Sequence, residues 1–341
     1  MGSDVRLALY GPREWQVFQR QTKQRGRVTV EGRFLGTVSA VEVRFLGKSA
    51  DGKKLDGRWR KAKLDHTTGG VTLSVDLPAG GWYALEARAL NRGKTVAEWA
   101  VDNFGVGEVF ITAGQSNSTS CGQFATRQRS GMVSSFNGTA WQKATDPMWG
   151  AHDLIGIDPA ELIVYAGGSP WPPFGDELFK LEGVPIGVAV TGHGGSSVHQ
   201  WQPGEELFEW MMTRIWQLGR DGFRAVLWHQ GESDVEMEPG VYIERFSRTV
   251  EGSRNKAGWA IPWFAAKVSY HSPDIPKWDN LRADFDAIWE SGIAMVGPDT
   301  DRLTGDHRDF DGMGIHFSVK GLTAHGKMWA KIVTKWLEET H

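Results

Sequence analysis

The sequence lacks most features that assign a chain to a special class of protein. It contains one cysteine, Cys121, which excludes an internal disulfide framework and a zinc site built from cysteines. No apolar run approaches the roughly 18 residues that span a bilayer, and the start, Met1–Asp4, has no basic-then-apolar signal pattern. The formal net charge is -3 and the lysines and arginines are scattered. We therefore expect neither a nucleic-acid nor a membrane partner.

Tryptophan is abundant, at 17 residues, far above its share in an average composition. Sugar-binding sites use such flat apolar faces, whereas packing in cores and interfaces accounts for most buried indoles. The hydrophobic share of 40% is that of an ordinary globular protein. A length of 341 residues favours two domains over one, because single hydrophobic cores usually stop growing below this size.

Residues 27–104 have the pattern of a small antiparallel β-sandwich. Short segments rich in valine and aromatic residues partly alternate in polarity, and turns such as Asp51-Gly52 and Gly80-Gly81 separate them. We place an Ig-like accessory β-sandwich domain at residues 1–105. The predicted strands are Arg27–Leu35, Ala40–Leu46, Val71–Leu77, Trp82–Leu90 and Thr95–Val101.

From about residue 107 onward, apolar strands alternate with amphipathic helices, which predicts an α/β fold with a mainly parallel sheet between helices. Ligands of such sheets bind beyond the carboxyl ends of the strands. Residues 118–182 show little periodicity, so we expect a long loop that carries Trp149 and Trp171 and walls the site. The predicted strands are Glu108–Ala113, Val184–Val190, Phe223–Trp228, Trp263–Val268 and Ile293–Val296, and the predicted helices are Glu205–Leu218, Val241–Lys256, Trp278–Glu290 and Lys320–Glu338.

Two polar clusters directly follow predicted strands. Gly114-Gln115-Ser116-Asn117 places the Ser116 hydroxyl at a strand-to-helix turn, a position that suits a nucleophile and equally a helix cap. Residues 192–197 are rich in glycine, which lets backbone amides point into a cavity as an oxyanion hole requires. A flexible turn has the same composition, so this second signal is weak by itself.

Two further clusters carry acids and histidines. In His229–Asp234, the Gln230 amide is a candidate oxyanion donor, and the acids are candidates for binding histidine, arginine or sugar hydroxyls, or for capping a helix. In Asp306–Ser318, His316 precedes the last helix, where a nearby acid would hold its second ring nitrogen. The aspartates of this region also suggest calcium, but their spacing is not that of an EF-hand, and we predict no metal. They are Asp299, Asp301, Asp306, Asp309 and Asp311.

Together the four clusters resemble those of SGNH hydrolases, in the carbohydrate-esterase branch that contains sialate O-acetylesterases and acetyl xylan esterases. The resemblance implies a flavodoxin-like, three-layer α/β/α catalytic domain at residues 106–341 after the β-sandwich, no cofactor, and export to the periplasm or medium. The matching residues, in the order of the family, are Gly114–Asn117, Gly194-Gly195-Ser196 with Trp201, His229–Asp234 and His316-Phe317-Ser318.

The resemblance also assigns roles. It implies that Ser116 is the nucleophile and His316 its general base. The implied oxyanion donors are the Ser116 amide, the amide of Gly194 or Gly195, and the Gln230 side chain. The family usually has an aspartate three residues before the histidine, where this chain has Met313. We expect Asp311 to replace it, narrowly ahead of Glu232, with Asp309 further off. The expected substrate-binding residues are Gln115, Asn117, Trp201, His229 and Asp234.

The implied activity is removal of O-acetyl groups from a carbohydrate, a sialate or a polysaccharide such as xylan, through an acetyl-enzyme. The expected partner is therefore an acetylated glycan. Two other functions stay open: a catalytically silent carbohydrate-binding protein, and an esterase of small or lipid esters. The tryptophans and the absence of a long apolar lid disfavour the lipid esterase. The sequence determines neither the sugar nor the oligomeric state.

Overall fold

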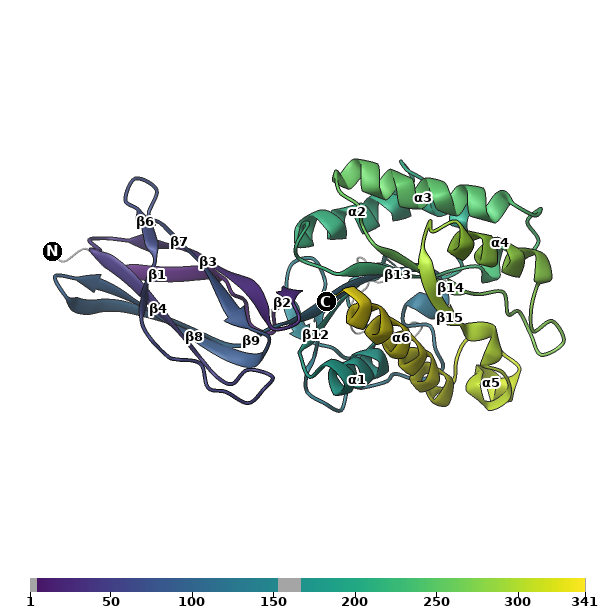
Figure 1. Ribbon diagram of the computed structural model, residues 1–341, viewed down its shortest axis with the longest axis horizontal. Helices are drawn as coiled ribbons and strands as arrows, with labels where there is room; N and C mark the ends of the chain where they lie inside the picture. The colour runs from purple at the N-terminus through teal and green to yellow at the C-terminus, as the bar shows by residue number, and fades with distance from the viewer. Residues whose placement is uncertain (1–4, 153–166, 341) are drawn as a thin grey trace. The chain divides into compact units, whose positions relative to one another are not determined.

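The computed structural model describes residues 5–152 and 167–340, and the chain divides into two compact units (Figure 1). The first unit extends to Glu108 and includes residues 140–142 and 183–186. The second unit contains the rest of the chain. Strands and helices are both present, so the prediction of a mixed α/β protein is confirmed.

The first unit is built from β-strands arranged in two sets. One set contains β1 (Arg6–Gly11), β2 (Val17–Thr22), β3 (Arg25–Leu35), β6 (Lys63–Asp65) and β7 (Gly70–Pro78), all joined by antiparallel pairing. The other contains β4 (Ala40–Leu46), β5 (Arg60–Lys61), β8 (Gly80–Asn91) and the first part of β9 (Lys94–Gly114), also antiparallel. β2 joins the two sets by pairing in parallel with β9. Alternate residues of β3 and β4 are buried, as the period of two requires.

A buried ion pair lies inside the first unit. The Arg20 Nε donates to Glu108 Oε1 at 2.6 Å, and the Gln19 amide donates to Glu108 Oε2 at 2.9 Å. The side chains of Arg20 and Glu108 are 1% and 0% exposed. Two charges so far from water are stable only when each has its partner.

The second unit contains a sheet of short strands, and the strands at its centre are fully buried. Its centre is formed by the last residues of β9, which pair in parallel with β13 (Ala225–His229). β13 pairs in parallel with β14 (Trp263–Lys267), and β14 with β15 (Met295–Asp299). β12 (Ile186–Val190), β10 (Val133–Phe136) and β11 (Trp141–Lys143) continue the sheet on the other side of β9. Unbroken burial of this kind is typical of strands that are covered on both faces.

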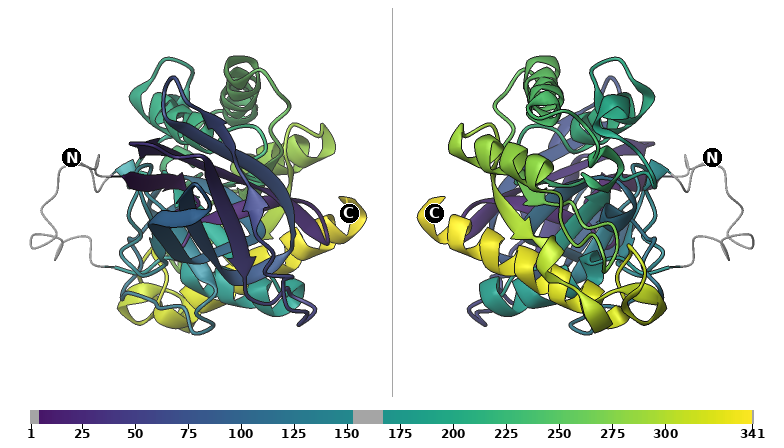
Figure 2. Two further views of the ribbon diagram at one scale, coloured as in Figure 1. Left: turned by 90° about the vertical axis from the view of Figure 1, so that its left-hand side faces the viewer. Right: turned by 90° about the vertical axis from the view of Figure 1, so that its right-hand side faces the viewer.

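Helices cover both faces of this sheet. Figure 1 shows α2 (Glu206–Leu218) and α3 (Val241–Ala257) on one face and α1 (Trp171–Glu182) and α6 (Val319–Thr340) on the other, and Figure 2 keeps α3 and α6 apart in the same way. α4 (Asp279–Glu290) contacts α3, and the short α5 (Asp309–Gly312) precedes α6. α6 buries His325, Trp329, Val333 and Leu337, one residue per turn, which makes the apolar stripe expected of a covering helix.

The expected loop at residues 118–182 is wrong in part. α1 begins at Trp171, and the prolines that follow it are tolerated in the first helical turn. Trp171 is fully buried, and its indole N–H donates to the Ser118 carbonyl at 2.8 Å. Trp171 is therefore a core residue, while Trp149 is half-buried. Residues 153–166 of the expected loop lie outside the described residues.

The buried pair predicts a large effect on stability. Arg20→Ala would leave Glu108 charged and buried without this partner, so we expect the free energy of unfolding to fall by about 3–5 kcal/mol. The matched control is Arg27→Ala, because Arg27 and its partner Asp76 are 65% and 53% exposed, and such pairs contribute about 0–1 kcal/mol. Urea denaturation measures both. Equal losses in the two variants would contradict this account.

Candidate active site

Ser116 lies at a tight turn that only a glycine at position 114 permits. Gly114 ends β9 with φ +127°, and a Cβ added there would lie 2.0 Å from the His229 carbonyl oxygen. The backbone N–H of the next residue, Gln115, donates a hydrogen bond to that same oxygen at 3.0 Å. Ser116 then opens the short 3-10 helix η1 (Ser116–Ser118). The strand-to-helix turn expected from the sequence is present.

The Gln115 side chain ties this turn to the loop after β13. Its Oε1 accepts hydrogen bonds from the Gln230 amide at 3.1 Å, the Gly231 N–H at 3.2 Å and the Ser233 N–H at 3.1 Å. Gln115 is 3% exposed. These contacts argue against the substrate-binding role expected for Gln115 and assign it a role in holding two loops together.

Gln230 and Asp234 extend the same network to the loop after β12. The Gln230 Nε2 faces the Gln115 Oε1, the Ser196 carbonyl at 3.1 Å and an oxygen of Asp234. That oxygen also accepts the Val198 N–H at 2.8 Å. A side-chain amide has two donor hydrogens, and the three acceptors here outnumber them. The geometry therefore argues against the expected oxyanion role of Gln230 and the expected substrate contact of Asp234, because both are buried and committed to other loops.

His229 and Trp201 are also inside the protein. His229 is 0% exposed, its Nε2 lies 3.0 Å from the Thr300 hydroxyl, and burial lowers its pKa to about 3, so its ring is neutral. The Trp201 indole N–H donates to Ser196 Oγ at 3.0 Å, and its ring packs edge-on against Trp228. A fully buried side chain has no surface to offer a glycan. Burial therefore argues against the expected substrate contacts of both residues and for packing roles.

The loop after β12 brings backbone amides next to η1. The His193 N–H donates to the Gly114 carbonyl at 3.0 Å, and a Cβ on Gly192 would lie 2.5 Å from Ser118 Oγ. Gly194 and Gly195 follow in the same turn, and Gly195 has φ +67° with open space around it. Neither the Ser116 nor the Gly195 N–H donates to an acceptor within residues 5–152 and 167–340. These two amides are available to face a developing negative charge.

A hydrogen bond of Asn117 brings the loop of His316 to η1. The Asn117 amide nitrogen donates to the Ile315 carbonyl at 3.2 Å and to Glu232 Oε1 at 2.8 Å. Asn117 directly follows Ser116, and Ile315 directly precedes His316. The bond therefore places the predicted nucleophile and base in one locality. Asn117 is 2% exposed, which again indicates positioning and not the expected contact with substrate.

Arg308 fixes the rest of that loop from inside. Its guanidinium donates to the carbonyls of Ile315 at 2.7 Å, Leu303 at 2.6 Å and Thr300 at 3.1 Å. The guanidinium carbon also lies 3.7 Å from the centre of the Tyr270 ring. Arg308 is 2% exposed, so these contacts replace its hydration. Arg308 thereby ties the backbone before His316 to the carbonyls of Thr300 and Leu303.

The acid next to His316 is Asp309. Its Oδ2 lies 3.7 Å from His316 Nδ1, and its N–H donates to the His316 carbonyl at 3.0 Å. Asp311, the expected partner, is exposed, because Phe310 and Asp311 both have left-handed backbones that turn the chain outward. Glu232 is buried beside Asn117, and its Oε1 lies 3.9 Å from Nδ1 of a different histidine, His229. Among the three acids considered, the structure therefore favours Asp309 as the partner of His316 over Asp311 and Glu232.

Burial sets the protonation of these groups. Burial lowers the pKa of His316 below its usual value of 6.5, although the Asp309 charge opposes the shift. Burial raises the pKa of Asp309, and it raises the pKa of Glu232 to about 7. At neutral pH the His316 ring is consequently neutral, which is the state in which an imidazole accepts a proton.

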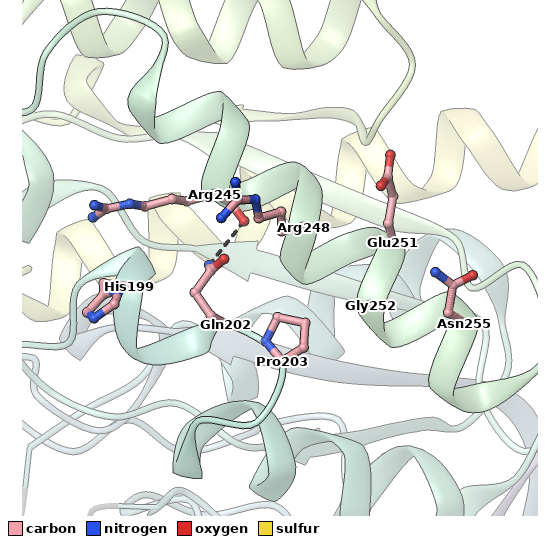
Figure 3. Close-up of a pocket in the computed structure, with 8 residues that line it drawn as sticks. All are labelled: His199, Gln202, Pro203, Arg245, Arg248, Glu251, Gly252 and Asn255. Carbon is pink, nitrogen blue, oxygen red and sulfur yellow. Dashed lines mark hydrogen bonds between the residues drawn. The ribbon is translucent and has the colours of Figure 1, made fainter.

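A separate groove lies along α3 and η4 (Val198–Trp201) (Figure 3). Its volume is about 580 Å³. The Arg245 side chain extends toward the His199 end, and Glu251 and Asn255 lie at the opposite end. No residue that the sequence analysis singled out lines it. The lining residues are His199, Gln202, Pro203, Arg245, Arg248, Glu251, Gly252 and Asn255.

Two of the aspartates considered for calcium pair with an arginine. Asp299 and Asp301 form ion pairs with Arg282 at 2.8 Å and 2.6 Å. Among the described residues, no group of three or more histidine, cysteine or acidic side chains is arranged to hold a metal ion. In the same part of the chain, no helix is both long and apolar enough to cross a membrane.

Comparison with known proteins assigns the family. Residues 106–335 match the family described as carbohydrate esterase, sialic acid-specific acetylesterase. The chain belongs to this family. The resemblance inferred from the four clusters is thus confirmed at the level of the family.

Individual relatives of the family are distant. A probable carbohydrate esterase from Arabidopsis thaliana is 28% identical over 97 residues, which are 28% of this chain and 35% of that protein. The matched part thus spans about a third of that relative. A carbohydrate acetylesterase structure from Xanthomonas citri has a TM-score of 0.59 at 18% identity, covering 98% of this chain and 76% of that one, and this likeness shows the fold alone. An Arabidopsis thaliana protein structure has a TM-score of 0.49 at 19% identity over 66% of this chain and 96% of that one.

The Asp309–His316 pair predicts a pH dependence. Because the pKa of His316 is lowered, we expect the acid limb of kcat/KM for p-nitrophenyl acetate to lie below pH 6.5. Asp309→Asn removes a charge that stabilises the protonated ring, so the limb moves to still lower pH, and the plateau falls at least about tenfold. Asp311→Asn is the matched control, and its profile stays that of the wild type. A shift in the control alone would restore Asp311 as the partner.

Proposed function

We propose that the protein is a serine esterase that removes O-acetyl groups from a carbohydrate, with Ser116 as nucleophile and His316 as general base. The observation that carries the proposal is the Asn117–Ile315 hydrogen bond of 3.2 Å, which joins the residue after Ser116 to the residue before His316. Asp309 supports the second nitrogen of the imidazole. The family match supports the class of reaction, and the contacts of the side chains support the role of each residue.

In this mechanism the Ser116 hydroxyl oxygen attacks the acetyl carbonyl carbon while His316 Nε2 takes the hydroxyl proton. The carbonyl oxygen becomes an oxyanion, which the N–H groups of Ser116 and Gly195, with Gly194 beside them, stabilise. Collapse breaks the bond to the sugar oxygen, and His316 returns its proton to that oxygen. Water then attacks the acetyl-enzyme with His316 again as base, and acetate and free Ser116 result.

Glu232 has a positioning role in this proposal. Its Oε1 accepts the Asn117 amide at 2.8 Å, and that amide also reaches Ile315. The carboxyl group is buried, and its raised pKa of about 7 means that part of the population is protonated at neutral pH. A group in that state is suited to orienting Asn117 and poorly suited to stabilising an imidazolium ion.

The proposal also extends to the domains. We assign residues 106–341 to an SGNH catalytic domain with three α/β/α layers, supported by the parallel pairing around β9 and β13. We assign residues 1–105 to an accessory β-sandwich of Ig-like type, supported by the antiparallel pairing of its strands. Export to the periplasm or medium is proposed from the family resemblance.

The first test is replacement of the nucleophile. We expect Ser116→Ala to lower kcat for acetate release at least about a thousandfold, because positioning and oxyanion stabilisation remain while covalent catalysis is lost. Acetate is measured after incubation with acetylated xylan, an O-acetylated sialic acid and p-nitrophenyl acetate. Ser291→Ala, at the end of α4, is the control and retains the wild-type rate.

The same panel separates the other functions. A near-normal rate in Ser116→Ala contradicts the serine mechanism. Binding of a glycan without acetate release by the wild type favours the silent binding protein. Faster hydrolysis of long-chain than of short-chain p-nitrophenyl esters favours a lipid esterase, and release from one sugar ester alone identifies the carbohydrate.

A further inference from the structure

The loop of Asp309 and His316 exposes two large apolar side chains that the proposed reaction does not use. Phe310 is 72% exposed and Met313 is 65% exposed. They are the two most exposed large hydrophobic side chains in residues 5–152 and 167–340. A single exposed apolar residue is ordinary, but two within one turn beside a candidate active site mark a contact surface.

The turn holds Phe310 in a backbone conformation that its side chain disfavours. Phe310 has φ 48° and ψ 50°, and Asp311 has φ 56° and ψ 34°. Residues other than glycine rarely adopt this left-handed region, and such strain concentrates at functional sites. Two hydrogen bonds maintain it, from the Met313 N–H to the Phe310 carbonyl at 3.1 Å and from the Gly314 N–H to the Asp309 carbonyl at 3.0 Å.

The Phe310 ring lies beside the Asp309–His316 pair. A Cβ added to Gly314 would lie 1.7 Å from Asp309 Oδ1 and 2.9 Å from Cδ2 of the Phe310 ring. The carboxylate and the ring edge thus meet at one point, Gly314. The same carboxylate group is 3.7 Å from His316 Nδ1 through its other oxygen. The exposed ring therefore lies near the carboxylate that supports the proposed general base.

We propose that Phe310, extended by Met313, is the platform on which a sugar ring of the acetylated substrate stacks. This inference rests on the proposed function. The C–H groups of a pyranose face form an apolar surface that suits the face of an aromatic ring. Trp201, an expected substrate contact, and Trp171, expected in the wall of the site, are fully buried, whereas Phe310 is exposed beside Asp309. Stacking there fixes the sugar whose ester oxygen His316 protonates.

The test compares two substrates in one set of variants. Phe310→Asn removes the ring and suits the left-handed backbone, because asparagine tolerates that region well. We expect the ratio of kcat/KM for acetylated xylotetraose to kcat/KM for p-nitrophenyl acetate to fall about tenfold, through KM of the oligosaccharide. Phe310→Tyr retains the ring and restores the ratio. The control Trp216→Ala, an aromatic residue 47% exposed on α2, keeps both values.

A binding measurement decides the same question without catalysis. Calorimetry with acetylated xylotetraose is carried out on Ser116→Ala and on Ser116→Ala combined with Phe310→Asn. We expect the dissociation constant to rise about tenfold in the double variant. If the wild type releases no acetate, the proposed function fails, but the dissociation constants still show whether Phe310 binds the sugar.

Three results would overturn the platform. One is an equal loss on both substrates in Phe310→Asn, which would indicate that the ring merely supports Asp309. Another is an unchanged ratio in Phe310→Asn. The third is that the oligosaccharide does not bind Ser116→Ala, or binds it and the double variant equally. Equal melting temperatures of the wild type and of these two variants show that all three are folded.

Discussion

The oxygen atom of one side-chain amide, that of Gln115, connects the loops from which the candidate site is built. Three donors from the loop after β13 converge on it, and the amide of Gln230 continues the network to the loop after β12. Loops lack the regular hydrogen bonding that holds strands together, so their relative positions depend on such side chains. Because the network is buried, each bond is stronger than it would be in water, and each unmade bond costs more.

A second set of buried contacts, made by Arg308, holds the loop of His316. Arg308 is a buried cation without a direct carboxylate hydrogen bond among the described residues, and it is held instead by three carbonyl groups and by the Tyr270 ring. The Ile315 carbonyl accepts hydrogen bonds from both Arg308 and Asn117, so the two sets of contacts meet next to His316. The residues that determine the geometry are thus mostly buried ones. Catalytic side chains need this support, because small errors in position reduce rates strongly.

The sequence predicted the strands and helices better than the contacts of individual polar residues. β4 was predicted with its true bounds, because period-two alternation is clear in a half-buried strand. α1 was missed because its first turn contains two prolines, which usually indicate a loop. Gln230, His229 and Asp234 were taken for site residues, because a polar residue after a buried strand has the same pattern whether it faces a ligand or another loop. Asp309 was ranked last among the acids because left-handed residues at 310 and 311 reverse the chain, and the sequence pattern does not reveal that reversal.

The indole rings of the second unit also have an optical consequence. Trp171, Trp201, Trp228, Trp263 and Trp329 are fully buried, and Trp228 lies 5.1 Å from Trp201 and 6.0 Å from Trp263 between ring centres. Shielded indoles emit at shorter wavelengths than hydrated ones, and rings this close exchange excitation energy. The short-wavelength part of the intrinsic fluorescence therefore comes largely from indoles packed in and around the sheet that bears the candidate site. The protein carries a spectroscopic reporter of that sheet without any added label.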